Sequence, residues 1–184
     1  MAKQNEQIQN KVTGEKITWL KTAANTNGAF LQFKMTLAPG GYLPVKHLHP
    51  NQQEQFTVKK GLFKVESGKQ ERFLKPGDSI TIEKGKPHRF WNALPNEETE
   101  LEVKFTPALN TEVFLEQFFG LSNDDKTKAD GTPAFLQLMS MANTYEIYVA
   151  GPPLWLQKVM GVVLGGIGRL LGYKKYYKKY SSLS

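Results

Sequence analysis

The side chains of this chain that could perform chemistry are concentrated in two short segments that each contain two glycines. The sequence contains three histidines, and all three lie in these segments. His47 and His49 are separated by one residue, Glu54 follows a short turn, and His88 comes from the second segment. Imidazoles and carboxylates are ligands of divalent first-row metals, and four such ligands leave coordination positions open for water, substrate or oxygen. The pattern therefore predicts a metal site.

These four side chains need particular elements to bring them together. In an extended strand, residues i and i+2 project from the same face, so His47 and His49 would lie side by side. The turn at 50–53 lets the chain fold back and direct Glu54 to the same point, while a rigid turn at 85–87 precedes His88. A lone histidine in a strand is more often a core or surface residue. A His-x-His pair joined by a glutamate and a distant histidine is hard to obtain by accident, so we expect metal ligation.

The first two-thirds of the chain is typical of a protein built from short strands. Residues 30–37 place Phe33, Met35 and Leu37 on one face and polar side chains on the other. Similar runs occur at 55–61, 62–67, 78–85, 88–92 and 100–107, separated by turns that contain glycine or proline. Many short strands without intervening helices predict a mainly β fold, either a sandwich or a barrel.

The two segments resemble the two short motifs of the cupin superfamily. The first reads Gly41-x5-His47-x-His49-x4-Glu54-x6-Gly61. The second reads Gly77-x5-Glu83-x-Gly85-x2-His88-x3-Asn92. Glu83 stands where the family usually has proline, at a turn position that is not a ligand. The strand pattern extends the resemblance to about residues 17–107.

This resemblance implies a double-stranded β-helix, the cupin or jelly-roll barrel, which is often dimeric. It also implies that one divalent metal ion is held inside the barrel mouth by His47, His49, Glu54 and His88. The ligand types leave iron, manganese, nickel, copper, cobalt and zinc all open. Because cupins include dioxygenases, isomerases, decarboxylases and binding proteins, the resemblance does not identify a substrate.

Other residues of the predicted strands are candidates for lining a substrate pocket. These are Gln32, Gln55, Phe56, Phe90 and Trp91. An aromatic side chain in such a strand more often fills the core than contacts a substrate. We expect Asn92 to close a turn or fix a loop. Outside the ligands, no serine, lysine or carboxylate has a spacing that marks a general base, so Glu54 is the candidate base should it leave the metal.

After Pro107 the pattern changes from strands to helices. We therefore expect a cupin β-barrel over 1–108 and a helical extension over 109–184. The extension is predicted to contain helices at about 111–119, 133–149 and 154–171, followed by a basic and aromatic tail, YKKYYKKY.

The third predicted helix carries a stripe of small residues on one face: Gly161, Gly165, Gly168 and Gly172. We expect this stripe to pack on the barrel, on the helix at 111–119, or on a second copy of itself. Contact of the helix with a membrane surface is a less favoured alternative. A membrane span is least favoured, because the stretch is short and contains Lys158 and Arg169.

Composition limits the functional classes further. The absence of cysteine excludes disulfides, thiolate nucleophiles and Cys-ligated metal sites. The net charge is +7, but lysines are interleaved with glutamates over residues 1–108 and no DNA-reading module is evident, so we expect no nucleic-acid binding. The N-terminus has no apolar run behind a basic start, which gives a cytoplasmic location by default.

We expect a non-haem metal-dependent oxygenase, dioxygenase-like, that acts as a homodimer on a small organic molecule. This hypothesis rests on the resemblance of the three-histidine, one-glutamate set to the dioxygenase branch of cupins. A metal-dependent isomerase or lyase on the same site is one alternative. The other is a non-catalytic cupin that binds a small molecule and whose C-terminal helices recruit a partner or a membrane surface.

Overall fold

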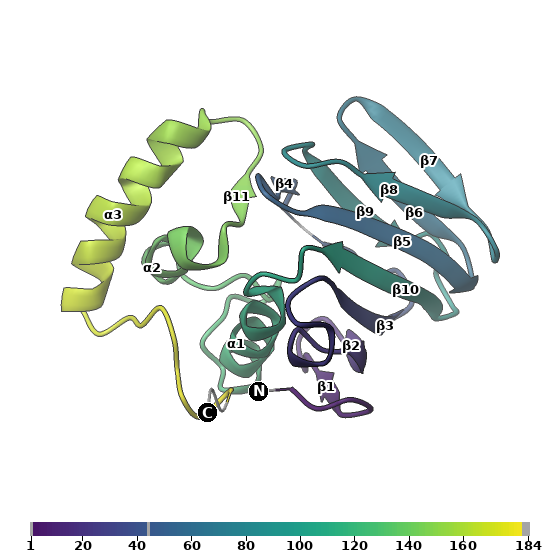
Figure 1. Cartoon of the computed structure of the whole chain (residues 1–184), viewed down its shortest axis with the longest axis horizontal. Coiled ribbons are helices and arrows are strands. Elements are labelled where there is room, and N and C mark those ends of the chain that lie inside the picture. The colour runs from purple at the N-terminus through teal and green to yellow at the C-terminus, as the bar shows by residue number, and fades with distance from the viewer. Residues whose placement is uncertain (1, 44, 182–184) are drawn as a thin grey trace.

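The computed structural model describes residues 2–43 and 45–181, and two β-sheets packed face to face form its centre (Figure 1). The strand order of the first sheet is β1-β2-β3-β10-β5-β8, and that of the second is β11-β4-β9-β6-β7. The first sheet comprises β1 (Gln7–Gln9), β2 (Lys16–Lys21), β3 (Leu31–Leu37), β10 (Thr99–Thr106), β5 (Gln53–Lys60) and β8 (Ser79–Ile82). The second comprises β11 (Tyr148–Val149), β4 (His47–Leu48), β9 (His88–Asn92), β6 (Phe63–Ser67) and β7 (Gln70–Leu74). The predicted mainly β fold is confirmed.

Alternation along each strand decides which side chains enter the space between the sheets. In β5, Glu54, Phe56 and Val58 are buried while their neighbours are partly exposed. Trp19 and Phe63 are also fully buried, and full burial of each such side chain contributes about 1.5–3 kcal/mol. Strand β7 was not among the predicted runs. Four of its five residues are exposed, so it lacks the alternation of buried and exposed positions on which the other predictions rest. The core of this sandwich therefore supports the strands that carry the candidate site.

The C-terminal part forms three helices on one side of the sandwich, with α3 farthest from the sheets (Figure 1). They are α1 (Thr111–Asn123), α2 (Phe135–Tyr145) and α3 (Leu154–Leu170), and a short 3₁₀ turn, η1 (Ala24–Thr26), precedes β3. Helix α1 extends beyond the predicted end at 119. Helix α3 matches its prediction closely, and Gly172, with φ of 92°, follows its end.

The prediction of a helix at 133–149 is wrong for its last four residues, which are not helical. Helix α2 ends at Tyr145 because Glu146 adopts a left-handed conformation, with φ of 53°. The residues that follow form β11, which pairs antiparallel with β4 and places Val149 opposite His47. The helical extension therefore contributes a strand to the second sheet, next to the candidate site.

The glycine stripe of α3 packs on α2, which differs from all three partners expected from the sequence. A Cβ atom added at Gly165 would lie 2.7 Å from the carbonyl oxygen of Met139, and one at Gly168 would lie 2.8 Å from that of Leu136. Such distances leave no room for a side chain, so the glycines allow the two helix backbones to approach closely.

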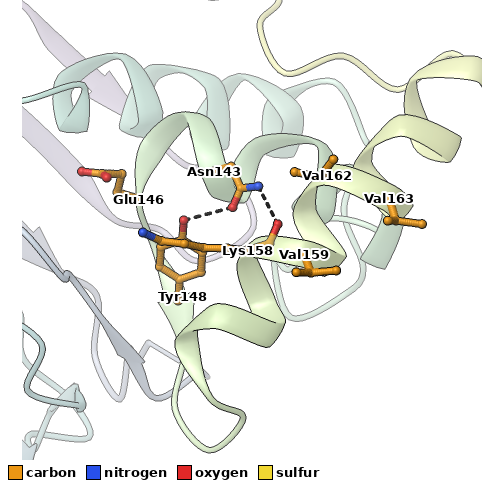
Figure 2. Close-up of a pocket in the computed structure, with 7 residues that line it drawn as sticks. All are labelled: Asn143, Glu146, Tyr148, Lys158, Val159, Val162 and Val163. Atoms are coloured by element: carbon orange, nitrogen blue, oxygen red, sulfur yellow. Dashed lines mark hydrogen bonds between the residues drawn. The ribbon is translucent and has the colours of Figure 1, made fainter.

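Two polar side chains join this helix pair to β11. Gln157 of α3 is buried and makes two hydrogen bonds to the backbone of Val149. The N–H of Val149 donates to Oε1 of Gln157 at 3.0 Å, and Nε2 of Gln157 donates to the carbonyl of Val149 at 3.0 Å. Asn143 of α2 accepts a hydrogen bond from the hydroxyl of Tyr148 and donates one to the carbonyl of Lys158 (Figure 2). The extension is thus held to the edge of the second sheet.

Among the residues that the structure describes, none of the helices has the length and apolar character needed to cross a bilayer.

Candidate metal centre

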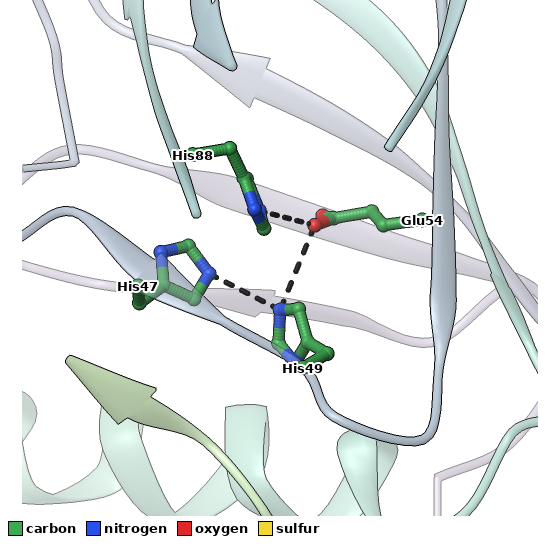
Figure 3. Close-up of side chains that lie close together, drawn as sticks. All are labelled: His47, His49, Glu54 and His88. Atoms are coloured by element: carbon green, nitrogen blue, oxygen red, sulfur yellow. Dashed lines mark hydrogen bonds and ion pairs between the residues drawn. The ribbon is translucent and has the colours of Figure 1, made fainter. Parts of the chain in front are cut away.

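The four predicted ligands converge inside the sandwich although they come from different strands (Figure 3). His47 begins β4 and His49 follows its end, while His88 begins β9 in the same sheet and pairs directly with His47. Glu54 projects from β5 in the opposite sheet. His49, Glu54 and His88 are buried, and His47 is half-buried. The site is therefore most accessible from the side of His47.

The distances between the ligand atoms fit a single metal ion. Nε2 of His47 lies 3.1 Å from Nε2 of His49, and Oε2 of Glu54 lies 2.7 Å from Nε2 of His88 and 3.6 Å from Nε2 of His49. All four ligand atoms lie within 4.8 Å of one another. Metal–nitrogen bonds of about 2.0–2.1 Å place neighbouring ligand atoms roughly 3 Å apart, so the arrangement suits coordination to one centre.

Backbone carbonyls orient two of the three imidazoles. Nδ1 of His47 lies 3.3 Å from the carbonyl oxygen of Val45, and Nδ1 of His88 lies 3.1 Å from that of Lys86. Because a carbonyl only accepts, each Nδ1 donates its proton to that carbonyl, and each Nε2 faces the site. Nδ1 of His49 is buried and has no hydrogen-bond partner among the described residues. The contacts of His49 within the site are therefore made through its Nε2, which lies 3.1 Å from that of His47.

Burial lowers the pKa of two of the three histidines and so favours their neutral form. Desolvation, followed by the neighbouring imidazoles, lowers the pKa of His47 well below its usual range. Desolvation also lowers the pKa of His49 to about 4, against an opposing effect of Glu54. For His88, burial acts to lower the pKa, but the hydrogen bond to Glu54 and its charge outweigh it, so that the pKa is raised. Neutral imidazole is the form that binds a metal.

The turn that delivers His88 forms despite the departure from the cupin motif at Glu83. Gly85 has φ of 71°, and its N–H donates to the carbonyl of His49 at 2.8 Å. The carbonyl of Glu83 accepts a hydrogen bond from the N–H of Lys86 at 3.1 Å, which closes the turn. Glutamate at this position is therefore compatible with the geometry that the site requires.

Asn92 fixes loops, as we expected, and lies away from the four ligands. Its side-chain nitrogen donates to the carbonyls of Ala38 and Glu97, and its oxygen accepts from the N–H of Leu94 and the hydroxyl of Thr99. These contacts tie the end of β9 to the segments that flank it.

The residues predicted to line a pocket divide between the two faces of their strands. Phe56 and Phe90 are buried between the sheets, with their rings 5.5 Å apart, on the same strand faces as Glu54 and His88 respectively. Gln32, Gln55 and Trp91 occupy the alternate, outer positions. Gln32 donates to Glu102 there, and the ring of Trp91 contacts Lys64 and Arg89. Strand alternation therefore turns these three away from the candidate site.

Two residues near the ligands were not identified from the sequence. The ring of Phe105 on β10 meets the ring of His49 edge-on at 5.2 Å, and it covers one side of the site. Gln52 is buried beside the turn and donates to the carbonyls of Pro107 and Ala108 and to the hydroxyl of Thr111. Alternation within 99–106 could have placed Phe105 inside, whereas the partners of Gln52 lie more than fifty residues away.

Comparison with known proteins agrees with this fold and site. Residues 33–103 match the family described as Cupin domain. An RmlC-like cupin from Shewanella frigidimarina superposes with a TM-score of 0.50 at 24% identity, and the match covers 61% of this chain and 93% of that one. The chain therefore belongs to the cupin superfamily.

Curated relatives add a coarse indication of activity. The chain is 29% identical over 160 residues to an oxidoreductase from Arthrobotrys oligospora, a match that covers 79% of this chain and 62% of the relative. It is also 29% identical over 153 residues to an epoxidase, atD, from Aspergillus terreus, covering 76% of this chain and 47% of the relative. The chain spans between 46% and 67% of the length of the curated relatives that it matches. It is thus a cupin with a candidate metal site and homology to oxidoreductases, which suggests an enzyme.

Proposed function

We propose that this cupin is a non-haem metal-dependent oxygenase that acts on a small organic molecule. The observation that carries the proposal is the convergence of three imidazoles and one carboxylate at a single point inside the sandwich. The likeness to an oxidoreductase and to an epoxidase supports an oxidative reaction. Because the chain covers only part of each relative, their activities inform the class of reaction and not its substrate.

The residues present fit a divalent first-row metal held by His47, His49, Glu54 and His88. When bound, such a metal supplies open coordination positions at which a substrate and oxygen can meet. Iron, manganese, nickel, copper, cobalt and zinc all remain candidates on ligand type.

The protein contributes orientation and a dry environment. The carbonyls of Val45 and Lys86 hold two imidazoles in place, and Glu54 accepts a hydrogen bond from His88. Phe105 and Phe90 are buried on the interior faces of the sheets and keep bulk water from that region. The half-buried position of His47 makes its side of the site the route by which a small molecule would enter.

The test is elemental analysis of tag-free protein together with oxygen uptake in the presence of candidate small organic substrates. The variant His47→Ala/His88→Ala serves as the control that lacks two ligands. We expect about one first-row metal per chain, oxygen consumption coupled to product, and loss of both in the variant while the circular dichroism spectrum is retained.

Other outcomes point to other functions. Product formation without oxygen consumption would indicate a metal-dependent isomerase or lyase. A ligand that binds the His47→Ala variant as tightly as the native protein, without turnover in either, would indicate a binding protein. A folded protein that takes up no metal after reconstitution would contradict the oxygenase proposal altogether.

A further inference from the structure

Helix α3 presents an apolar face to solvent. We define the outer face of α3 by six exposed side chains that recur at helical spacing: Trp155, Val159, Val162, Val163, Ile167 and Leu170. The glycine stripe lies on the opposite side and packs on α2. An ordinary surface helix has the reverse arrangement, with its large apolar side chains turned inward. The exposed fraction is 67% for Trp155 and 89% for Leu170, so this surface is open to a partner.

The exposure is concentrated on this helix and not spread over the molecule. Among the described residues, seven of the fourteen exposed large apolar side chains lie between residues 155 and 171. Three of them, Val159, Val162 and Val163, line an open groove between α3 and the α2–β11 segment (Figure 2). A contiguous exposed apolar patch marks an interaction site, whereas single apolar side chains scattered over a surface do not.

Positive charge accompanies this apolar face. From residue 147 onward the sequence contains no aspartate or glutamate but six basic residues: Lys158, Arg169, Lys174, Lys175, Lys178 and Lys179. The preceding residues carry eighteen basic and seventeen acidic side chains, so nearly all of the net charge belongs to the last part of the chain. Pairing this surface with a second copy of itself would bring like charges together. An anionic partner would instead bring opposite charges together.

The C-terminal end of α3 adds a basic and aromatic cavity. An open cavity of about 1010 Å³ lies at Leu171 and the residues after it. Its lining includes Tyr173, Lys174, Tyr177 and Lys178. Lys174 and Lys178 are exposed, whereas Lys179 is paired with Asp124. Tyrosine and lysine side chains together are typical of the headgroup region of a bilayer, where an aromatic ring and a cation both find partners.

We propose that the outer face of α3 docks flat on the surface of an anionic lipid bilayer. The six apolar side chains would enter the boundary between headgroups and acyl chains, while Lys174, Lys175 and Lys178 contact lipid phosphates and carboxylates. Docking in the plane of the surface agrees with the finding that no described helix can cross a bilayer. This proposal is independent of the metal chemistry, since none of the six side chains belongs to the candidate metal centre.

The experiment is co-sedimentation of the full chain with vesicles. One set contains phosphatidylcholine with about one-third phosphatidylserine, and the other contains phosphatidylcholine alone. Val162→Asp/Val163→Asp removes the apolar character of the outer face, and Phe73→Asp is its matched control, because Phe73 is a 58% exposed side chain on β7 of the sandwich. Lys174→Gln/Lys175→Gln/Lys178→Gln tests the charges, with Lys69→Gln/Lys75→Gln/Lys84→Gln as control.

We expect the native chain to bind anionic vesicles at least about ten-fold more tightly than neutral ones, and added salt to weaken this binding. The valine variant should bind about ten-fold more weakly and the C-terminal lysine variant roughly a hundred-fold more weakly, while both controls bind like the native chain. Failure of the folded native chain to bind either vesicle overturns the proposal, as does an equal loss in Phe73→Asp. A dimer that the valine variant dissociates, without any vesicle binding, would show that a second copy covers this face.

Discussion

The sandwich and the helical extension use apolar residues in opposite ways. The sandwich turns Trp19, Phe56 and Phe63 inward, where each is fully buried. Helix α3 turns glycines inward and leaves Trp155 and Leu170 in solvent. The sandwich is therefore stabilised by burial of large side chains, whereas the α2–α3 pair is held by close backbone approach and a few hydrogen bonds. An apolar run in a sequence thus does not by itself say which side of an element faces the protein.

The candidate metal centre lies where these two regions meet. His47 pairs with His88 on one edge of β4 and with Val149 of β11 on the other. The sandwich supplies all four ligands, and the extension supplies the strand that completes their sheet. Substitutions in each region, and at the link between them, can therefore separate what each contributes.

The largest effect is expected for a substitution of a metal ligand in the sandwich. His88→Ala should abolish metal binding and, in protein stripped by a chelator, lower the free energy of unfolding by about 3 kcal/mol, because the buried carboxylate of Glu54 loses its hydrogen-bonded partner. Elemental analysis and urea unfolding measure the two effects. His47→Ala should abolish metal binding equally but cost about 1 kcal/mol or less, since His47 is half-buried and does not pair with Glu54. Equal destabilisation by both variants would contradict this account.

The extension should respond to added volume at its inward face. Gly165→Ala should lower the free energy of unfolding by about 1–3 kcal/mol, because the new methyl group would meet the backbone of Met139. Gly166→Ala is the matched control on the same helix. Its nearest neighbour would be the guanidinium of Arg169 at 3.8 Å, so it should be neutral or stabilise by about 1 kcal/mol through helix propensity. Thermal unfolding of both variants tests whether close backbone approach holds the helix pair.

The titration of the ligands gives a third prediction. His47 and His49 have lowered pKa values and are neutral at neutral pH, so His88, whose pKa is raised, is the imidazole that must lose a proton for a metal to bind. Metal affinity should therefore be highest at pH values above the pKa of His88 and fall about tenfold per pH unit as the pH drops below it. Isothermal titration calorimetry in buffers of different ionisation enthalpy measures the released proton. Affinity independent of pH between about pH 8 and pH 5 would be inconsistent with His88 as a ligand.

The smallest effect is expected at the link between the regions. Gln157→Ala removes both hydrogen bonds that hold the backbone of Val149, and should loosen β11 and weaken metal binding a few-fold. Trp155→Ala lies on the same helix but faces solvent, so metal affinity should not change. Equal affinity in the two variants would mean that the sandwich alone positions His47.

Most of the sandwich and the ligand set could be predicted from the sequence. The pattern of Phe33, Met35 and Leu37 identified β3, and the spacing of His47, His49, Glu54 and His88 identified the cluster that the structure brings together. These signals are local, because a strand alternates with a period of two and a glycine turn needs only its own residues. Gln32, Gln55 and Trp91 point to the outer faces for the same local reason, since each lies an odd number of positions from an inward-facing residue of its own strand (Phe33, Glu54 and His88).

The sequence by itself determined the type of fold, the four candidate ligands and the basic character of the C-terminal segment, because each is encoded by residue type and short spacing. Only the tertiary structure decided that residues 148–149 form a strand beside His47, that the glycines of α3 face α2, and which ring nitrogens point into the site. These features depend on contacts between residues far apart in the chain. The free energy of such contacts depends on which surfaces meet, and that is not encoded in any one segment.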